Sequence, residues 1–463
     1  MRRIEVLDTT LRDGNKLPFV VLTAREKLQL ARRLADMGVD VIEAGQPALS
    51  PEESECVSLV AAEVEGTAVS ACARALEGDT ERALDCLRGA RIPYLHVFMP
   101  VSPWFLNRIM KKSAAESLRE IGRCVRLGKE AGVKVQFSLS EAPHADPGFM
   151  ADAVAAACEA GVDVLSAADT NGILMPADVT RLLDMLRGLT GRCPVPPVLG
   201  VHCHNDLGLA TANTLAAVEA GATHVETTIG GFGARAGNAA LEEIAFLLEA
   251  FAQRLDIEHG LRLDGIRAAA ETLDRLTGLR THPNKPVIGR AALMEGPSSG
   301  ARRSMDPSIA ALLSQGTIGT SPHGEGAVPG EPEPFRLESF TVTTGSHSLP
   351  VAGIRIEKDG LITSQSSHGS GPIDALFHAV DKALGLEPRL TLYSVATLSM
   401  GTDAEADVTV TVEHRGKRFH GHAKSRDVIE ASLRAYVGAL GSVAPCGELD
   451  PAEFYVQGEN LWE

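Results

Sequence analysis

The chain has 463 residues, of which 44% are hydrophobic and 22% charged, the composition of a globular protein with two or three domains. A net charge of −16 argues against nucleic acid or an anionic membrane as a partner. The sequence has no 18-residue apolar run and opens without an apolar leader, so we expect no membrane span and a cytoplasmic location. Its eight cysteines form no C-x-x-C pair, which favours reduced thiols over a disulfide framework or a zinc finger.

One pattern recurs in the first 290 residues: an alanine-rich helical stretch, a glycine, then an apolar strand. Glycine just past a helix is a left-handed cap, and continuous apolar strands are buried on both faces. The glycines are Gly38, Gly132, Gly161 and Gly221, and the strands are residues 39–43, 133–137, 162–165 and one reaching residue 228. Four more strands are expected at residues 4–10, 68–74, 94–101 and 198–205. Eight βα units predict a (β/α)8 TIM barrel over residues 1–290, with the active site at the C-terminal strand ends. A doubly wound sheet is the alternative, but no G-x-G-x-x-G follows the first strand.

His202 and His204 end the seventh predicted strand. Alternate residues of a strand point the same way, so these two imidazoles, about 7 Å apart, leave the chain on one face. Such a pair suits one divalent cation, and the alternative is two polar residues that close a strand. Asp13 follows the first strand, where it is either a turn residue or a third ligand. One carboxylate and two imidazoles leave positions open for substrate, a catalytic arrangement for Zn, Mn, Co or Mg.

Further polar side chains are expected at the same rim of the barrel. Arg12 places a fixed positive charge against a developing oxyanion, with Glu43 as its partner; a simple rim salt bridge is the alternative. Thr170 either binds substrate or caps the next helix. The other predicted substrate-binding or catalytic residues at strand ends are Arg74, His96, Ser138 and Glu141.

Three strings, at residues 7–14 (LDTTLRDG), 200–208 (GVHCHNDLG) and 236–243 (AGNAALEE), together resemble the acyl-CoA-condensing branch of the DRE-TIM metallolyases. That branch includes 2-isopropylmalate, homocitrate and citramalate synthases. The resemblance implies a Claisen-type condensation of acetyl-CoA with a 2-oxo acid, giving a 2-substituted malate and CoA. It implies that Asp13, His202 and His204 hold a divalent metal ion that polarises the ketone, and that Asn238 is a further metal-associated position. Arg12 then stabilises the alkoxide, and Glu43 holds Arg12 in place.

The sequence departs from this family at several rim positions. After Arg12-Asp13-Gly14 the usual Glu-Gln is Asn15-Lys16. Lys16 is either a solvated loop lysine or a cation that favours a more negative substrate. Four small residues stand where the family usually has other side chains: Ser140 and Ala234 for glutamates, and Ser166 and Ala168 for the asparagine and proline of isopropylmalate synthases.

The family also carries an acid/base histidine in a helical subdomain after the barrel. Here the corresponding residues 291–303 contain no histidine. His282, His323 or a group of a partner subunit are the possible substitutes, and the sequence does not choose among them.

Residues 291–336 are rich in proline, glycine and serine and are predicted to be a linker with a truncated subdomain. Residues 337–463 are predicted to be an α+β domain with an internal βββα duplication, which resembles the regulatory and dimerisation domain of 2-isopropylmalate synthases. The resemblance implies a homodimer and an amino-acid effector, commonly leucine, with regulatory positions at Gly371, Asp374, Asp427 and Glu430. The alternative is a dimerisation module that has lost its effector.

These observations predict a metal-dependent acetyl-CoA:2-oxo-acid acyltransferase of the alkylmalate synthase type. The nearest label is 2-isopropylmalate formation in leucine biosynthesis, and the departures leave room for a specialised or more anionic oxo acid. Two alternatives belong to other classes. One is a lyase that runs the reverse cleavage, and the other is a non-catalytic paralogue that binds an amino acid.

Overall fold

The computed structural model describes residues 1–17, 20, 22–289, 312, 335–346, 348–358, 361–397, 406–415 and 417–441. The chain divides into two compact units. The first joins Met1–Leu273 to Thr281–Ser321, and the second joins Asp274–Arg280 to Pro322–Glu463. The predicted linker at residues 291–336 lies almost wholly outside the described residues, so its boundaries stay predictions.

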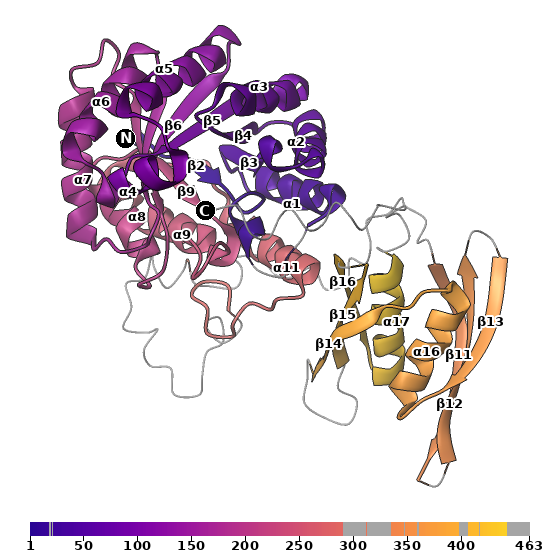
Figure 1. Ribbon diagram of the computed structural model, residues 1–463. Coiled ribbons are helices and arrows are strands. Elements are labelled where there is room, and N and C mark those ends of the chain that lie inside the picture. The colour runs from indigo at the N-terminus through magenta and orange to yellow at the C-terminus, as the bar shows by residue number, and fades with distance from the viewer. Residues whose placement is uncertain are drawn as a thin grey trace, which may run out of the picture. The chain divides into compact units, whose positions relative to one another are not determined.

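The first unit is built on a closed barrel of eight parallel strands that neighbour one another in chain order (Figure 1). This confirms the predicted (β/α)8 fold. Strands β3 and β7 are buried at every position, as expected for strands covered on both faces. The barrel strands are β2 (Glu5–Asp8), β3 (Val41–Gly45), β4 (Ala68–Arg74), β5 (Pro93–Pro100), β6 (Lys134–Ser140), β7 (Val164–Asp169), β8 (Val198–Cys203) and β9 (His224–Thr227).

Helices follow the strands and surround the barrel (Figure 1). Residues at the start of a helix fix where it begins. At the first helix, Thr23 and Glu26 form a capping box, in which their side chains accept hydrogen bonds from free backbone amides. Gly38 and Gly161 have φ of 76° and 87°, the left-handed caps that the repeated pattern predicts. The helices are α1 (Ala24–Asp36), α2 (Pro51–Glu63), α3 (Glu77–Cys86), α4 (Pro103–Phe105), α5 (Ala114–Glu130), α6 (Pro147–Glu159), α7 (Pro176–Thr190), α8 (Ala210–Glu219), α9 (Leu241–Ala250), α10 (Ala252–Leu255) and α11 (Ile266–Thr277).

Two features of the first unit were not predicted. A short strand β1 (Arg2–Arg3) pairs in parallel with β10 (Ile257–Glu258) outside the barrel. Cys158, at the end of α6, forms a disulfide with Cys193, which follows α7, with the two Cα atoms 5.7 Å apart. The prediction of reduced thiols is therefore wrong for this pair. Neighbouring βα units bring the two ends together in space, although 35 residues separate them in sequence.

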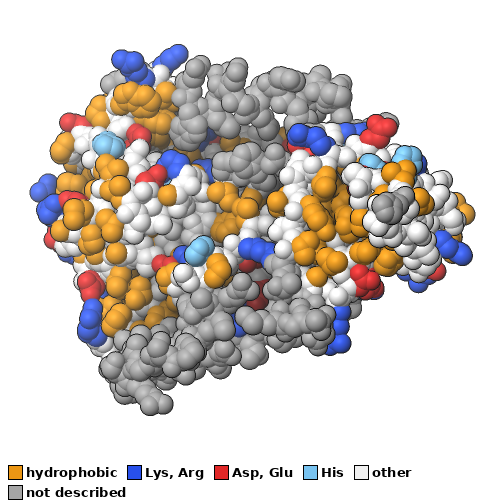
Figure 2. Space-filling view, turned by 90° about the horizontal axis from the view of Figure 1, so that it is seen from below, with side chains coloured by type: hydrophobic (Ala, Val, Ile, Leu, Met, Phe, Trp, Pro, Cys, Tyr) orange, Lys and Arg blue, Asp and Glu red, His pale blue; other side chains and the backbone are white. Residues whose placement is uncertain are grey.

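The second unit repeats a three-stranded antiparallel sheet followed by a helix, which confirms the predicted βββα duplication. Helix α16 packs on the first sheet and α17 on the second, and the two helices contact each other through stacked rings of Phe377 and Tyr436, 3.9 Å apart. Apolar side chains remain exposed on the sheets, among them Leu361 and Ile362, and Figure 2 shows apolar surface on this unit. The elements are β11 (Phe335–Gly345), β12 (Ser348–Lys358), β13 (Leu361–His368), α16 (Pro372–Leu384), β14 (Arg389–Thr397), β15 (Ala406–His414), β16 (Lys417–Ser425) and α17 (Val428–Gly441).

None of the helices in the described part of the chain has the length and apolarity needed to cross a membrane.

Candidate active site

Three side chains with metal-ligating atoms meet at the C-terminal end of the barrel. His202 is on β8, His204 directly follows that strand, and Asp13 lies in the turn after β2. Each offers one ligand atom, and these atoms lie within 4.8 Å of one another. All three residues are buried, so their polar atoms are held away from bulk water. One carboxylate and two imidazoles at this spacing suit a single divalent cation with open coordination positions.

The protonation states of this cluster also suit a cation. Burial alone would raise the pKa of Asp13, but the positive charges of Arg12 and Lys16 outweigh it and hold that pKa well below its usual range. Burial, together with the neighbouring His202, lowers the pKa of His204 to about 3. At neutral pH Asp13 is therefore a carboxylate and His204 a neutral imidazole, and these are the forms that bind metal ions.

Asn238 is placed against the same cluster. Its Nδ2 donates to Asp13 Oδ2 at 3.0 Å and to the Phe232 carbonyl at 3.0 Å. Its Oδ1 is buried and finds no hydrogen-bond partner among the described residues. Gly233 permits this approach, because a Cβ there would lie 2.0 Å from Asn238 Nδ2. An unpaired buried oxygen beside three ligand side chains fits the metal-associated position that the family resemblance implies.

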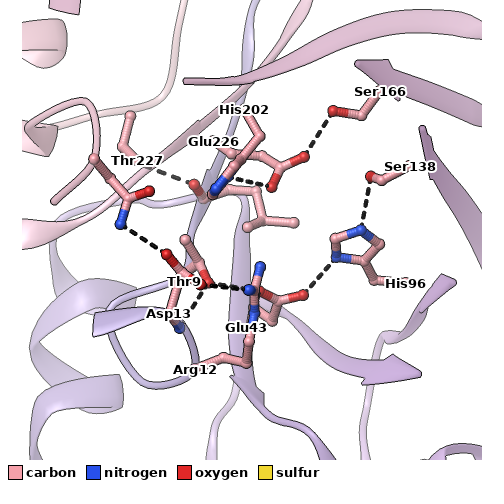
Figure 3. Close-up of polar contacts among 12 residues, drawn as sticks. Thr9, Arg12, Asp13, Glu43, His96, Ser138, Ser166, His202, Glu226 and Thr227 are labelled. Carbon is pink, nitrogen blue, oxygen red and sulfur yellow. Dashed lines mark hydrogen bonds and ion pairs between the residues drawn. The ribbon is translucent and has the colours of Figure 1, made fainter. Parts of the chain in front are cut away.

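Arg12 is fixed by a chain of buried hydrogen bonds (Figure 3). Its Nε donates to Glu43 Oε2 at 2.7 Å, and its Nη1 donates to Asp13 Oδ1 at 2.7 Å. His96 Nδ1 lies 2.5 Å from the other oxygen of Glu43, and His96 Nε2 lies 2.7 Å from Ser138 Oγ. Burial alone would raise the pKa of Glu43, but the charges of Arg12 and His96 lower it far below its usual value. The chain therefore brings together five of the predicted residues and holds the guanidinium beside the ligand cluster.

Glu226 is a candidate site residue that the sequence analysis missed. Its Oε2 lies 2.9 Å from His202 Nδ1 (Figure 3). Its Oε1 accepts from Gln136 Nε2 and from Ser166 Oγ, both at 2.7 Å. Burial alone would raise the pKa of Glu226, but the charge and hydrogen bond of His202 lower it to about 2. A carboxylate behind a ligating imidazole fixes the orientation and tautomer of the ring. The available signal was that Glu226 is an acidic residue inside a predicted barrel strand, where side chains are usually buried.

Other predicted residues line the rim at a greater distance from the ligand cluster. Thr170 Oγ1 accepts from the Glu141 amide at 2.8 Å and lies 3.2 Å from Ser140 Oγ. Thr170 does not cap the next helix, whose N-cap is Met175. Glu141 has a positive φ of 57°, and its carboxylate accepts from Ser102 Oγ.

Arg74 is not part of this hydrogen-bonded cluster. It pairs with Asp79 on α3, with Nε 2.6 Å from Oδ2, and its side chain is 48% exposed. Arg235 instead is the arginine beside Thr170: its Nη2 donates to the Thr170 carbonyl at 2.6 Å, and its side chain also pairs with Asp206 at 2.8 Å.

His282 and His323 are the two histidines of this chain that the sequence offers as acid/base groups. His282 is exposed, and its Nδ1 accepts from the Asn284 amide at 3.2 Å. His323 lies outside the described residues.

The predicted regulatory residues are at the N-terminal ends of the two helices of the second unit. Gly371 is the N-cap of α16, and Asp374 in its first turn accepts from the Ser370 amide at 2.7 Å. Asp374 also lines a cavity of about 930 Å³. Asp427 accepts from the Ile429 amide at 2.8 Å, and Glu430 accepts from Ser425 Oγ at 2.6 Å. These two acids therefore make local contacts at the start of α17.

Comparison with known proteins also gives a barrel domain followed by a C-terminal domain. The HMGL-like family model matches residues 3–273, and the model of the LeuA allosteric (dimerisation) domain matches residues 308–444. The HMG-CoA lyases of Bacillus subtilis and Pseudomonas aeruginosa share the barrel fold, with a TM-score of 0.52 for each. They are 23% and 22% identical, and the matches cover 61% and 60% of this chain and 96% and 95% of theirs.

Curated relatives match the chain across both of these domains. The 2-isopropylmalate synthase of Carboxydothermus hydrogenoformans is 33% identical, over 96% of this chain and 98% of that protein. The 2-isopropylmalate synthase of Pyrococcus furiosus is also 33% identical, over 96% of this chain and 99% of that protein. The chain therefore belongs to the 2-isopropylmalate synthase family, in which an HMGL-like barrel is followed by a LeuA allosteric (dimerisation) domain.

Proposed function

We propose that the protein condenses acetyl-CoA with a 2-oxo acid to give a 2-substituted malate and CoA. The observation that carries this proposal is the buried set of Asp13, His202 and His204 with the Arg12 guanidinium held beside it. A divalent ion bound there, such as Mg, Mn, Zn or Co, supplies Lewis-acid polarisation of the oxo acid's ketone. The relatives are named 2-isopropylmalate synthase, so 2-oxo-3-methylbutanoate is the reference oxo acid with which the others in the assay are compared.

Arg12 stabilises the charge that develops in the carbon–carbon bond-forming step, and Glu43 holds Arg12 in position. As the acetyl carbon attacks the keto carbon, the keto oxygen gains negative charge. Arg12 is already in place beside the ligand cluster because Glu43 and Asp13 accept its hydrogen bonds, so little reorganisation is needed. The oxygen then takes a proton to become the tertiary hydroxyl, and water cleaves the thioester to release CoA.

Glu141 is the residue we propose for removing the proton from the methyl group of acetyl-CoA. It lies at the end of β6 on the rim of the barrel, and its carboxylate accepts from the neutral Ser102 hydroxyl. Its left-handed backbone conformation, φ 57°, is uncommon for a residue with a side chain and is found at functional sites. A carboxylate at the rim that is not neutralised by a cation in its described contacts remains available as a base.

The second unit is proposed to form a homodimer and to bind an amino-acid effector. Its match to the LeuA allosteric (dimerisation) domain and its exposed apolar side chains support the dimer. A cavity that runs along α16, lined among others by Ser370, Asp374 and Lys382, is large enough for an amino acid and offers it polar partners.

Thiol release tests the reaction. Purified protein with Mg²⁺, Mn²⁺ or Zn²⁺ is mixed with acetyl-CoA and a panel of 2-oxo acids, and the CoA thiol is titrated. Release that requires both the oxo acid and the metal, and that is lost in His202→Ala, is the expected result. No release with any oxo acid would exclude the synthase. Cleavage of a 3-hydroxyacyl-CoA in place of condensation would favour the lyase.

A further inference from the structure

Lys16 brings a second cation to the ligand cluster. Its Nζ lies 3.1 Å from Asp13 Oδ1, the oxygen that also accepts from Arg12. The other oxygen of Asp13 accepts from Asn238. The buried carboxylate is therefore satisfied without Lys16, and a lysine is not needed to stabilise it.

Once a metal ion occupies the cluster, the positive charge of Lys16 no longer has a carboxylate of its own. The cation and Lys16 then share one carboxylate and repel each other. Neighbouring carboxylates are already engaged, since Glu43 pairs with Arg12 and Asp206 pairs with Arg235. The Lys16 side chain is 42% exposed, so its long flexible stem lets the ammonium turn toward the open side of the site. An anionic group on the substrate would give the Lys16 ammonium the partner that it then lacks.

The wall of the barrel next to the cluster is polar. Alternate residues of a barrel strand face inward, and on β6 they are Gln136, Ser138 and Ser140. Ser166 on β7 donates to Glu226, and Ser140 lies against Thr170. A branched alkyl group gains affinity by burial against apolar side chains, and this hydroxyl-bearing wall offers few of them. A polar substrate side chain fits it better.

We infer that the 2-oxo acid carries a second anionic group, a carboxylate or phosphonate, and that Lys16 binds this group. The inference rests on the proposed condensation and names the substrate class for it. An ammonium recognises either anion as a point charge, so the carboxylate-bearing and the phosphonate-bearing oxo acids are tested separately.

The test uses matched pairs of oxo acids on the Mg²⁺-loaded full-length protein. 2-Oxoglutarate is compared with 2-oxopentanoate, and phosphonopyruvate with 2-oxobutanoate. We expect at least one anionic acid to exceed its neutral analogue in kcat/KM by about tenfold or more. Lys16→Gln is expected to reduce that ratio about 10- to 100-fold, the usual effect of losing a hydrogen bond to a charged group. Lys16→Arg, which keeps the charge, restores most of the ratio. Lys129→Gln on α5, which also removes an ammonium paired with a carboxylate (Asp163) but outside the site, is the matched control.

Binding of each oxo acid without acetyl-CoA, measured by isothermal titration calorimetry, keeps the inference separate from the proposed reaction. Tighter binding of the anionic member in the wild type, weakened in Lys16→Gln and by added salt, supports the inference even where no thiol is released, in which case only the proposed reaction fails. Equal binding of both members of each pair overturns the inference. A Lys16→Gln effect that is the same for anionic and neutral acids also overturns it, because the lysine would then act only through Asp13 and the metal.

Discussion

Glu226 Oε2 lies 2.9 Å from His202 Nδ1, so a buried carboxylate stands directly behind one of the three ligand side chains. A cation held by the other ring nitrogen would require the proton to be on Nδ1, and a carboxylate 2.9 Å from that atom favours this tautomer. Ser166 and Gln136 in turn donate to Glu226 and fix its position. The orientation of this candidate metal ligand is thus set by residues on the barrel strands β6, β7 and β9.

Replacing Glu226 should therefore weaken metal binding without removing a ligand. We expect Glu226→Gln to reduce the affinity for Mn²⁺ or Zn²⁺ about 10- to 100-fold, measured by isothermal titration calorimetry. Glu226→Asp should recover part of the loss, because it restores the charge at a slightly different distance. The exposed Glu130→Gln on α5 is the control. An unchanged affinity in Glu226→Gln would show that the carboxylate serves only the packing of the barrel.

Removing a ligand should abolish stabilisation by metal. A ligand that binds only the folded state adds about 2.7 kcal/mol at a concentration of 100 Kd, so excess Mn²⁺ should raise the melting temperature of the wild type. Asp13→Asn keeps the shape of the side chain but loses its charge, and its melting temperature should not respond to Mn²⁺. Circular dichroism checks that the variant is folded. The same rise in both proteins would contradict the assignment of Asp13.

The proposed base has a distinct kinetic signature. Glu141→Gln should lower kcat about 100-fold or more, the usual contribution of a general base, while the affinity for metal and oxo acid is retained. Loss of solvent deuterium exchange into the methyl group of acetyl-CoA in Glu141→Gln would locate the defect at proton removal. The exposed Glu159→Gln at the end of α6 is the matched control. Exchange at the wild-type rate would assign the base to another group.

The opposite end of the barrel predicts a pH dependence of stability. Burial alone would raise the pKa of Glu5, but the hydrogen bond and charge of His224 and the ammonium of Lys134 outweigh it and lower that pKa to about 2. Because the folded pKa is below the unfolded one, the stabilisation is complete above about pH 4.5 and is lost as the pH falls toward 2. It amounts to about 3 kcal/mol at neutral pH.

Glu5→Gln should accordingly destabilise the protein at pH 7, and the difference from the wild type should shrink between pH 4.5 and pH 2. Urea denaturation at several pH values measures this difference. Glu258→Gln, an exposed acid on β10, should show no such trend. A difference that stays constant with pH would mean that Glu5 contributes through packing and not through its charge.

Much of the barrel could be predicted because its signals are local. A glycine after a helix and an apolar run after the glycine are both read within a few residues, and the strand period places His202 and His204 on one face. The role of Glu226 was not predicted because it depends on contacts with Gln136 and Ser166, which lie on other strands. The Cys158–Cys193 bond escaped for the same reason: its geometry depends on how two βα units pack, and no short motif records it.

That disulfide has a consequence for local unfolding. It closes a covalent loop that contains the whole of β7 and α7, including Thr170 at the rim. A segment tied at both ends loses most of the conformational freedom it would gain by detaching, so this βα unit should open only together with its neighbours. Amide hydrogen exchange in β7 should then be as slow as that of the most protected barrel strands, and should accelerate when a reductant breaks the disulfide.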